Sequence, residues 1–139
     1  MKQIMLVTNN PRDYSNFIEI LQTAHTVDAM GYIPTAQYKL SKCLKEYILI
    51  IIEIRMLTLG KFSLEETKDG TITGIIWFEK ELVQLGIPVV FWSYDEENEK
   101  LIDELKIKYP DNKIGFLQRD NFEEDHLLNG VEKFLNLKK

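Results

Sequence analysis

Five polar side chains stand at the ends of apolar segments, where they could act together: Thr8, Asn9, Glu53, Ser93 and Arg119. In an open sheet of parallel strands, ligands and reacting groups lie beyond the carboxyl ends of the strands. We therefore expect these side chains to share one site. A guanidinium and a carboxylate pair through two charge-assisted hydrogen bonds. The chemistry predicted is an ion pair between Glu53 and Arg119, with a further hydrogen bond from Ser93.

Residue type and spacing disfavour other kinds of site. His25 and His126 have no partners at metal-ligand spacing, and the single cysteine, Cys43, cannot form an internal disulfide. Ser93 lacks the G-x-S-x-G elbow of a serine nucleophile. No glycine-rich loop that could bind phosphates follows the first strand, because residues 9–11 are Asn-Asn-Pro. We expect no metal, no cofactor and no enzymatic activity.

Five strand–helix units position these residues. Apolar runs rich in β-branched residues predict buried strands, and apolar residues at three- and four-residue spacing predict amphipathic helices. The strands are expected at 4–7, 26–30, 47–54, 88–92 and 113–117. The helices are expected after Pro11, then at 35–45, from 74 to a glycine cap at Gly86, at 95–109 and at 122–137. This alternation predicts a parallel sheet with helices on both faces.

The segment 57–73 departs from this alternation. It is expected to be a long loop with a short helical turn at 64–67. Connections of this length in a compact domain are uncommon and are often functional. Two interpretations stay open: a lid over a ligand site, and a surface insertion that the fold tolerates at small cost in free energy.

The chain resembles a response-regulator receiver domain. The resemblance rests on the five units together with a carboxylate at the end of the third strand (Glu53), a hydroxyl at the end of the fourth (Ser93) and a base at the end of the fifth (Arg119). It covers the whole chain except for the extra residues after Met56. It implies a single α/β domain over 1–139 with the flavodoxin-like (βα)5 fold and the strand order 2-1-3-4-5.

The resemblance also implies which residues occupy the family's phosphorylation site. The two acids that bind Mg²⁺ in that family fall on Thr8 and Asn9, and the phosphoaccepting Asp falls on Glu53. Thr8 and Asn9 offer only neutral oxygens, so a site with one carboxylate should hold Mg²⁺ weakly. We therefore expect a degenerate receiver in which Glu53 is not phosphorylated.

The remaining family positions define a conformational switch. The switch hydroxyl falls on Ser93, the switch aromatic on Phe116, and the family's Lys-Pro pair on Arg119 and Asp120. One hypothesis is that a Glu53–Arg119 pair locks one signalling conformation without phosphate. The other is that the site is vestigial and Glu53 points into solvent.

Charge distribution indicates the kind of partner. The net charge is −5, and residues 1–45 carry five bases and three acids (+2), against twelve bases and nineteen acids (−7) in residues 46–139. This acidity disfavours nucleic acid, and no segment is long and apolar enough for a membrane span or a secretory signal. A cytoplasmic protein is expected.

The leading functional hypothesis is therefore a stand-alone signalling module that acts through protein contacts. Its partner would be a sensor kinase or a downstream effector with a basic patch, bound on the face formed by the fourth helix, fifth strand and fifth helix. The same face could form a homodimer. The alternatives are a phosphoaccepting regulator or phosphate sink, and a flavodoxin-like binder of a small ligand.

Overall fold

The computed structural model describes residues 2–9, 15–93, 95–118 and 124–136. It contains one parallel sheet of five strands: β1 (Gln3–Val7), β2 (Val27–Met30), β3 (Tyr47–Glu53), β4 (Val89–Ser93) and β5 (Ile114–Gln118). The strands lie in the order β2-β1-β3-β4-β5, and every neighbouring pair is parallel. The predicted doubly wound topology is confirmed.

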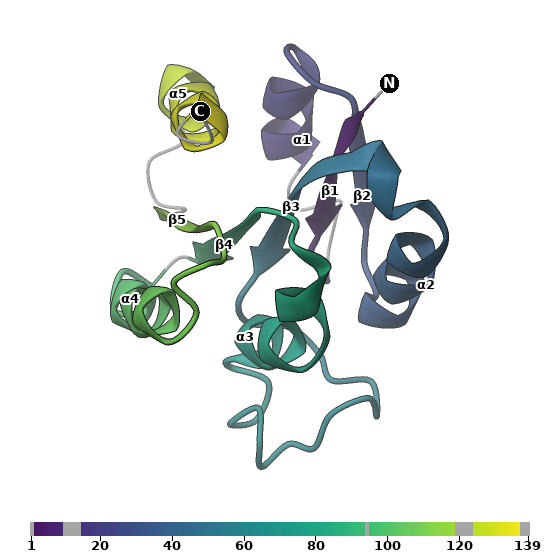
Figure 1. Ribbon diagram of the computed structural model, residues 1–139, viewed down its shortest axis with the longest axis vertical. Helices are drawn as coiled ribbons and strands as arrows, with labels where there is room; N and C mark the ends of the chain where they lie inside the picture. Colours follow the sequence, from purple (N-terminus) through teal and green to yellow (C-terminus); the bar gives the residue numbers. More distant parts are fainter. Residues whose placement is uncertain (1, 10–14, 94, 119–123, 137–139) are drawn as a thin grey trace.

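Five helices cover the two faces of the sheet (Figure 1). They are α1 (Ser15–Gln22), α2 (Ile33–Cys43), α3 (Thr73–Trp77), α4 (Asn98–Lys108) and α5 (Glu124–Asn136). Helices α1 and α5 cover one face, and α2, α3 and α4 cover the other. Alternate residues of β3 therefore enter two separate cores: Leu49 and Ile51 face α1 and α5, while Ile50 and Ile52 face the other layer. Burial on both faces explains the unbroken apolar run.

The third helix differs from the regular helix that its periodicity predicts. After α3 the backbone continues as a π-helical turn, η3 (Phe78–Leu82), and a 3-10 turn, η4 (Val83–Leu85). Gly86 ends the segment in the left-handed conformation at φ 74°, as its position predicted. A π-turn accommodates one extra residue and is frequent at functional sites. The three consecutive charged residues of this turn contact two different segments: Glu79 contacts the end of α4, whereas Lys80 and Glu81 contact the segment 57–69.

The second helix also ends earlier than predicted. A 3-10 turn, η2 (Leu44–Glu46), follows α2 and leads into β3. Cys43, the last residue of α2, is exposed. Ala24 lies beyond the end of α1 at Gln22 and is exposed as well.

Residues 57–69 form a loop that projects beyond α3 (Figure 1). Its two ends are joined, because Met56 N–H donates to Gly70 O at 3.1 Å and Thr73 Oγ1 donates to Met56 O at 2.6 Å. Compact loops with joined ends are Ω-loops, and they often carry function. We call residues 57–69 the Ω-loop and its closure at Met56, Gly70 and Thr73 the neck.

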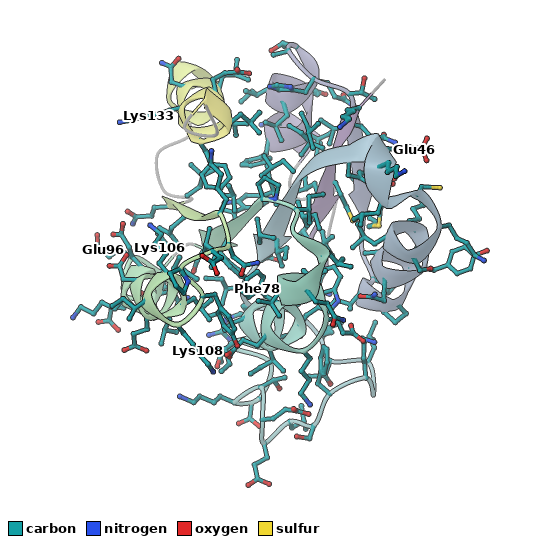
Figure 2. All side chains as sticks on the ribbon, in the orientation of Figure 1. Glu46, Phe78, Glu96, Lys106, Lys108 and Lys133 are labelled. Atoms are coloured by element: carbon teal, nitrogen blue, oxygen red, sulfur yellow. The ribbon has the colours of Figure 1, made fainter. Side chains whose placement is uncertain are left out.

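The Ω-loop is also fastened to η3. Lys61 Nζ lies 2.9 Å from Glu81 Oε1, and Lys80 Nζ lies 2.5 Å from Glu66 Oε1. Both lysines lie over the ring of Phe62, which is buried among core residues. On the opposite side of η3, Glu79 accepts hydrogen bonds from the end of α4. Figure 2 shows Lys108 on the side of α4 that faces α3.

Candidate functional site

The carboxyl ends of β1, β3 and β4 bring the predicted site residues together. Val7 pairs with Ile52, so Thr8 comes beside Glu53, and Glu53 pairs with Trp92, the residue before Ser93. Thr8 is fully buried, and its Oγ1 donates a hydrogen bond to Glu53 Oε1 at 2.9 Å. The half-buried Glu53 carboxylate is therefore held by a neighbouring strand. This hydrogen bond argues against the hypothesis that Glu53 merely points into solvent.

Asn9 fixes the start of the Ω-loop. Its Oδ1 accepts a hydrogen bond from Leu57 N–H at 2.6 Å, and its Nδ2 donates to Gly31 O at 3.4 Å. One side chain therefore links the ends of β1, β2 and β3. The sequence indicated that Asn9 replaces an acid, but nothing in the local pattern revealed that its amide holds a segment 48 residues away.

Ser93 organises the start of α4. Its side-chain oxygen accepts hydrogen bonds from Asp95 N–H at 3.0 Å and from Asn98 Nδ2 at 2.9 Å. Asp95 Oδ1 in turn accepts from Glu97 N–H at 2.9 Å. These contacts satisfy donors at the beginning of the helix. Sequence reasoning treated Ser93 as a donor to Glu53 and missed this role, which the Ser-x-Asp-x-x-Asn pattern encodes.

The other two switch positions are placed differently. Phe116 lies in β5, pairs in register with Phe91, and packs half-buried against the core beneath α3 and α4. Arg119 and Asp120 lie outside the described residues. The Glu53–Arg119 ion pair therefore stays a prediction.

An open groove adjoins these residues, with a volume of about 990 Å³. Its floor contains Glu53, Trp92 and Ser93. One wall is the neck and the adjoining ends of the Ω-loop, and the other is the start of α4. The residues that complete its lining are Asn9, Arg55, Met56, Leu57, Lys68, Asp69, Gly70, Thr71, Ile72, Asp95, Asn98 and Leu101. A groove of this size is at the upper end of the range for small-molecule sites.

Two glycines permit the close packing around the groove. A Cβ on Gly74 would lie 2.5 Å from Glu53 O and 2.9 Å from Ile52 Cγ2, so α3 approaches the end of β3 only with glycine here. Gly70 has φ 85°, and a Cβ there would lie 2.9 Å from Met56 O. The sequence indicated a helix from Gly74. No local signal showed that glycine is required at this position for the close approach to β3.

Comparison with known proteins identifies this architecture. No family model and no curated protein matches the chain. Solved structures do match over nearly its full length. A response regulator receiver domain protein from Clostridium thermocellum is 10% identical, with a TM-score of 0.67, covering 99% of this chain and 97% of that one. A two-component response regulator from Clostridium difficile is 14% identical, with a TM-score of 0.67 and coverage of 100% and 99%.

A third match extends the comparison to the metal site. A response regulator from Thermotoga maritima in complex with Mg²⁺-BeF is 20% identical, with a TM-score of 0.60 and coverage of 96% and 99%. The chain therefore has the CheY-like fold of response-regulator receiver domains, at the low identity expected of a divergent variant. The resemblance inferred from the sequence is confirmed at the level of fold.

The residues of this chain do not fit a magnesium site at the same place. Within the described part of the chain, no three His, Cys, Asp or Glu side chains are grouped as a metal site requires. Glu53 is the last residue of β3, and the described residues that follow β1, Thr8 and Asn9, contribute neutral oxygens. Mg²⁺ favours carboxylate oxygens in near-octahedral geometry. The Thr8 hydroxyl instead donates a hydrogen bond to Glu53.

Among the described residues, no helix has the length and apolar character required to cross a membrane.

Proposed function

We propose that this chain is a receiver-like signal-transduction module that acts through protein contacts and without phosphorylation of Glu53. It is a module of the two-component or phosphorelay type, and it is not an enzyme. The observation that carries the proposal is the hydrogen bond of 2.9 Å from Thr8 Oγ1 to Glu53 Oε1. A buried hydroxyl stands where a magnesium-dependent receiver needs a carboxylate.

Physical chemistry gives two reasons why Glu53 should not accept phosphate. Phosphoryl transfer depends on a metal ion to neutralise developing charge, and the available donors do not support one. Glu is also one methylene longer than Asp, which moves the carboxylate by about 1 Å, and a displacement of this size costs roughly a hundredfold in rate. The module would then hold one conformation, with the Glu53 carboxylate fixed by Thr8 in place of phosphate.

The proposed readout surface is the α4–β5–α5 face, where α4 and α5 flank β5 on opposite sides of the sheet edge (Figure 1). Its charge is uneven. Residues 95–104 hold six acids and one base, whereas Lys106 and Lys108 end α4. A sensor kinase or effector with a basic patch would complement the acidic part, and a homodimer through this face is the alternative. Complementary charge mainly raises the association rate.

Intact-mass measurement after incubation with Mg²⁺ and acetyl phosphate tests the proposal. We expect no mass gain for the natural chain. A stable gain of one phosphoryl group that disappears in Glu53→Gln would instead establish a phosphoaccepting regulator or phosphate sink.

A gain-of-function variant provides the matched comparison. Thr8→Asp, Asn9→Asp and Glu53→Asp together restore the three acids that Mg²⁺ requires. We expect this variant to bind Mg²⁺ and to gain one phosphoryl group under the same conditions. Mg²⁺ binding by the natural chain at equal strength would contradict the argument from the donor set.

A further inference from the structure

We infer that the groove between the Ω-loop and the start of α4 is a docking site for a protein segment that carries a large apolar side chain flanked by lysine or arginine. This inference rests on the proposed function in one respect, because it assumes that the chain acts through protein contacts. It assigns those contacts to the groove and the Ω-loop, which adjoin the α4–β5–α5 face at the start of α4.

The apolar requirement follows from what the groove exposes. Leu57 lies at its mouth with 60% of its surface exposed, and Ile72 and Leu101 are half-buried in its walls. Two more leucines of the Ω-loop, Leu59 and Leu64, are 51% and 59% exposed. The Ω-loop thus exposes three leucines, one of which lines the groove. A folded chain that exposes several large apolar side chains on one projecting segment offers a surface for association.

The occupant is a protein segment because of the extent of this surface. A small ligand would fill the groove itself, which has a volume of about 990 Å³. It would leave the leucines of the Ω-loop exposed. A peptide segment can place one side chain in the groove and cover the loop with its neighbours, as in recognition by anchor residues.

The requirement that the partner segment carry lysine or arginine follows from the balance of charge around the groove. The acids that line it or lie between residue 95 and the first turn of α4 are Glu53, Asp69, Asp95, Glu96, Glu97 and Glu99. The bases in the same region are Arg55, Lys68 and Lys100. Six acids and three bases give this described region a net charge of −3.

The acids at the start of α4 are available to a partner. Glu96, Glu97 and Glu99 are exposed, and none forms an ion pair with a residue that the structure describes. The turn before α4 keeps these residues close together, because Asn98 N–H donates to Asp95 O and Glu99 N–H donates to Glu96 O, both at 3.0 Å. Charges on neighbouring residues of one turn interact within the screening length of about 8 Å at physiological salt. Asp95 lines the groove itself, so the field of these carboxylates favours a cation at this wall.

Selection of peptides on the full-length chain tests the inference. The probe is a phage-displayed library of random twelve-residue peptides, and selected peptides are then measured by fluorescence polarisation. We expect enrichment of Leu, Phe or Trp flanked by Lys or Arg. Leu57→Ser should weaken binding about tenfold or more, the effect of removing one buried leucine contact.

Two matched controls localise the binding. Ile107→Ser removes a residue that is 81% exposed on α4 but does not line the groove, and it should leave binding unchanged. Glu97→Gln with Glu99→Gln should weaken binding about threefold to fivefold. The double variant Glu19→Gln and Asp111→Asn changes the net charge equally at exposed positions outside the groove and should change affinity less than twofold.

Three outcomes would overturn the inference: no enriched peptide, enrichment without basic residues, or binding that Ile107→Ser abolishes and Leu57→Ser preserves. The last outcome would favour the α4–β5–α5 face and leave the proposed function intact. Conversely, phosphorylation of Glu53 would refute the proposed function without affecting peptide binding to the groove. The two failures are therefore distinguishable.

Discussion

Substitution of Gly74 by alanine should destabilise the fold at the point where it positions Glu53. Alanine is favoured over glycine inside a helix by about 0.5–1 kcal/mol. Here its Cβ would lie 2.5 Å from Glu53 O, so β3 and α3 would have to separate by about 1 Å to reach ordinary contact distances. Overpacking of a close interface costs about 1–3 kcal/mol, and contact with sheet backbone favours the upper end. We expect a net loss of about 2 kcal/mol.

Guanidinium unfolding, followed through the fluorescence of Trp77 and Trp92, measures this loss. Both tryptophans are fully buried, so the signal reports the core on both faces of the sheet. A loss of 2 kcal/mol corresponds to a decrease in Tm of roughly 6–8 °C for a chain of this size. Gly60→Ala is the control, because its added Cβ meets nothing within 4 Å and only the left-handed backbone is strained, by about 1–2 kcal/mol. An unchanged midpoint for Gly74→Ala would refute the steric argument.

Three further predictions concern the neck and two titrating groups. Thr73→Val removes the hydrogen bond to the Met56 carbonyl and should cost about 1–3 kcal/mol while increasing amide exchange in the Ω-loop; unchanged exchange would contradict a role in closure. Burial, followed by a hydrogen bond to a neighbouring carboxylate, raises the pKa of Tyr47. The contribution of un-ionised Tyr47 to the stability of the fold is therefore complete below about pH 10, the ordinary tyrosine value, and is lost as pH rises further. Absorbance at 295 nm should show one tyrosine that ionises late. Simultaneous titration of all six tyrosines would disprove this. A hydrogen bond with the Glu46 side chain raises the pKa of the Cys43 thiol, so Glu46→Gln should accelerate iodoacetamide alkylation at pH 8, measured by mass spectrometry. An equal or slower rate would argue against that hydrogen bond.

The sheet and its topology were predictable from local pattern. Residues 47–54 are apolar without alternation because the strand is covered on both faces, and that condition is met only near the middle of the sheet. Glu53 ends β3 and Thr8 directly follows β1, so parallel pairing alone brings them together. The local sequence of the two strands was therefore enough to predict that Thr8 and Glu53 lie side by side.

Contacts between distant segments were not predictable in this way. The Ω-loop is held by pairs such as Lys61 with Glu81, which lie 20 residues apart and carry no joint periodicity. The π-turn in the third helix was not predictable, since its residues have the same apolar spacing as an α-helix. The contacts of Ser93 with Asp95 and Asn98 were also missed, because they depend on the detailed geometry of the α4 start.

The neck has a consequence for how such a domain can diversify. Because hydrogen bonds join Met56 to Gly70 and Thr73, the path of the chain leaves the strand–helix junction and returns to the same place. A segment of another length or composition between residues 56 and 70 would leave that junction unchanged, and the entropic cost of closing a longer loop grows only logarithmically. The junction can therefore serve as a grafting point, at which the loop can be exchanged while the sheet that supports it stays unaltered.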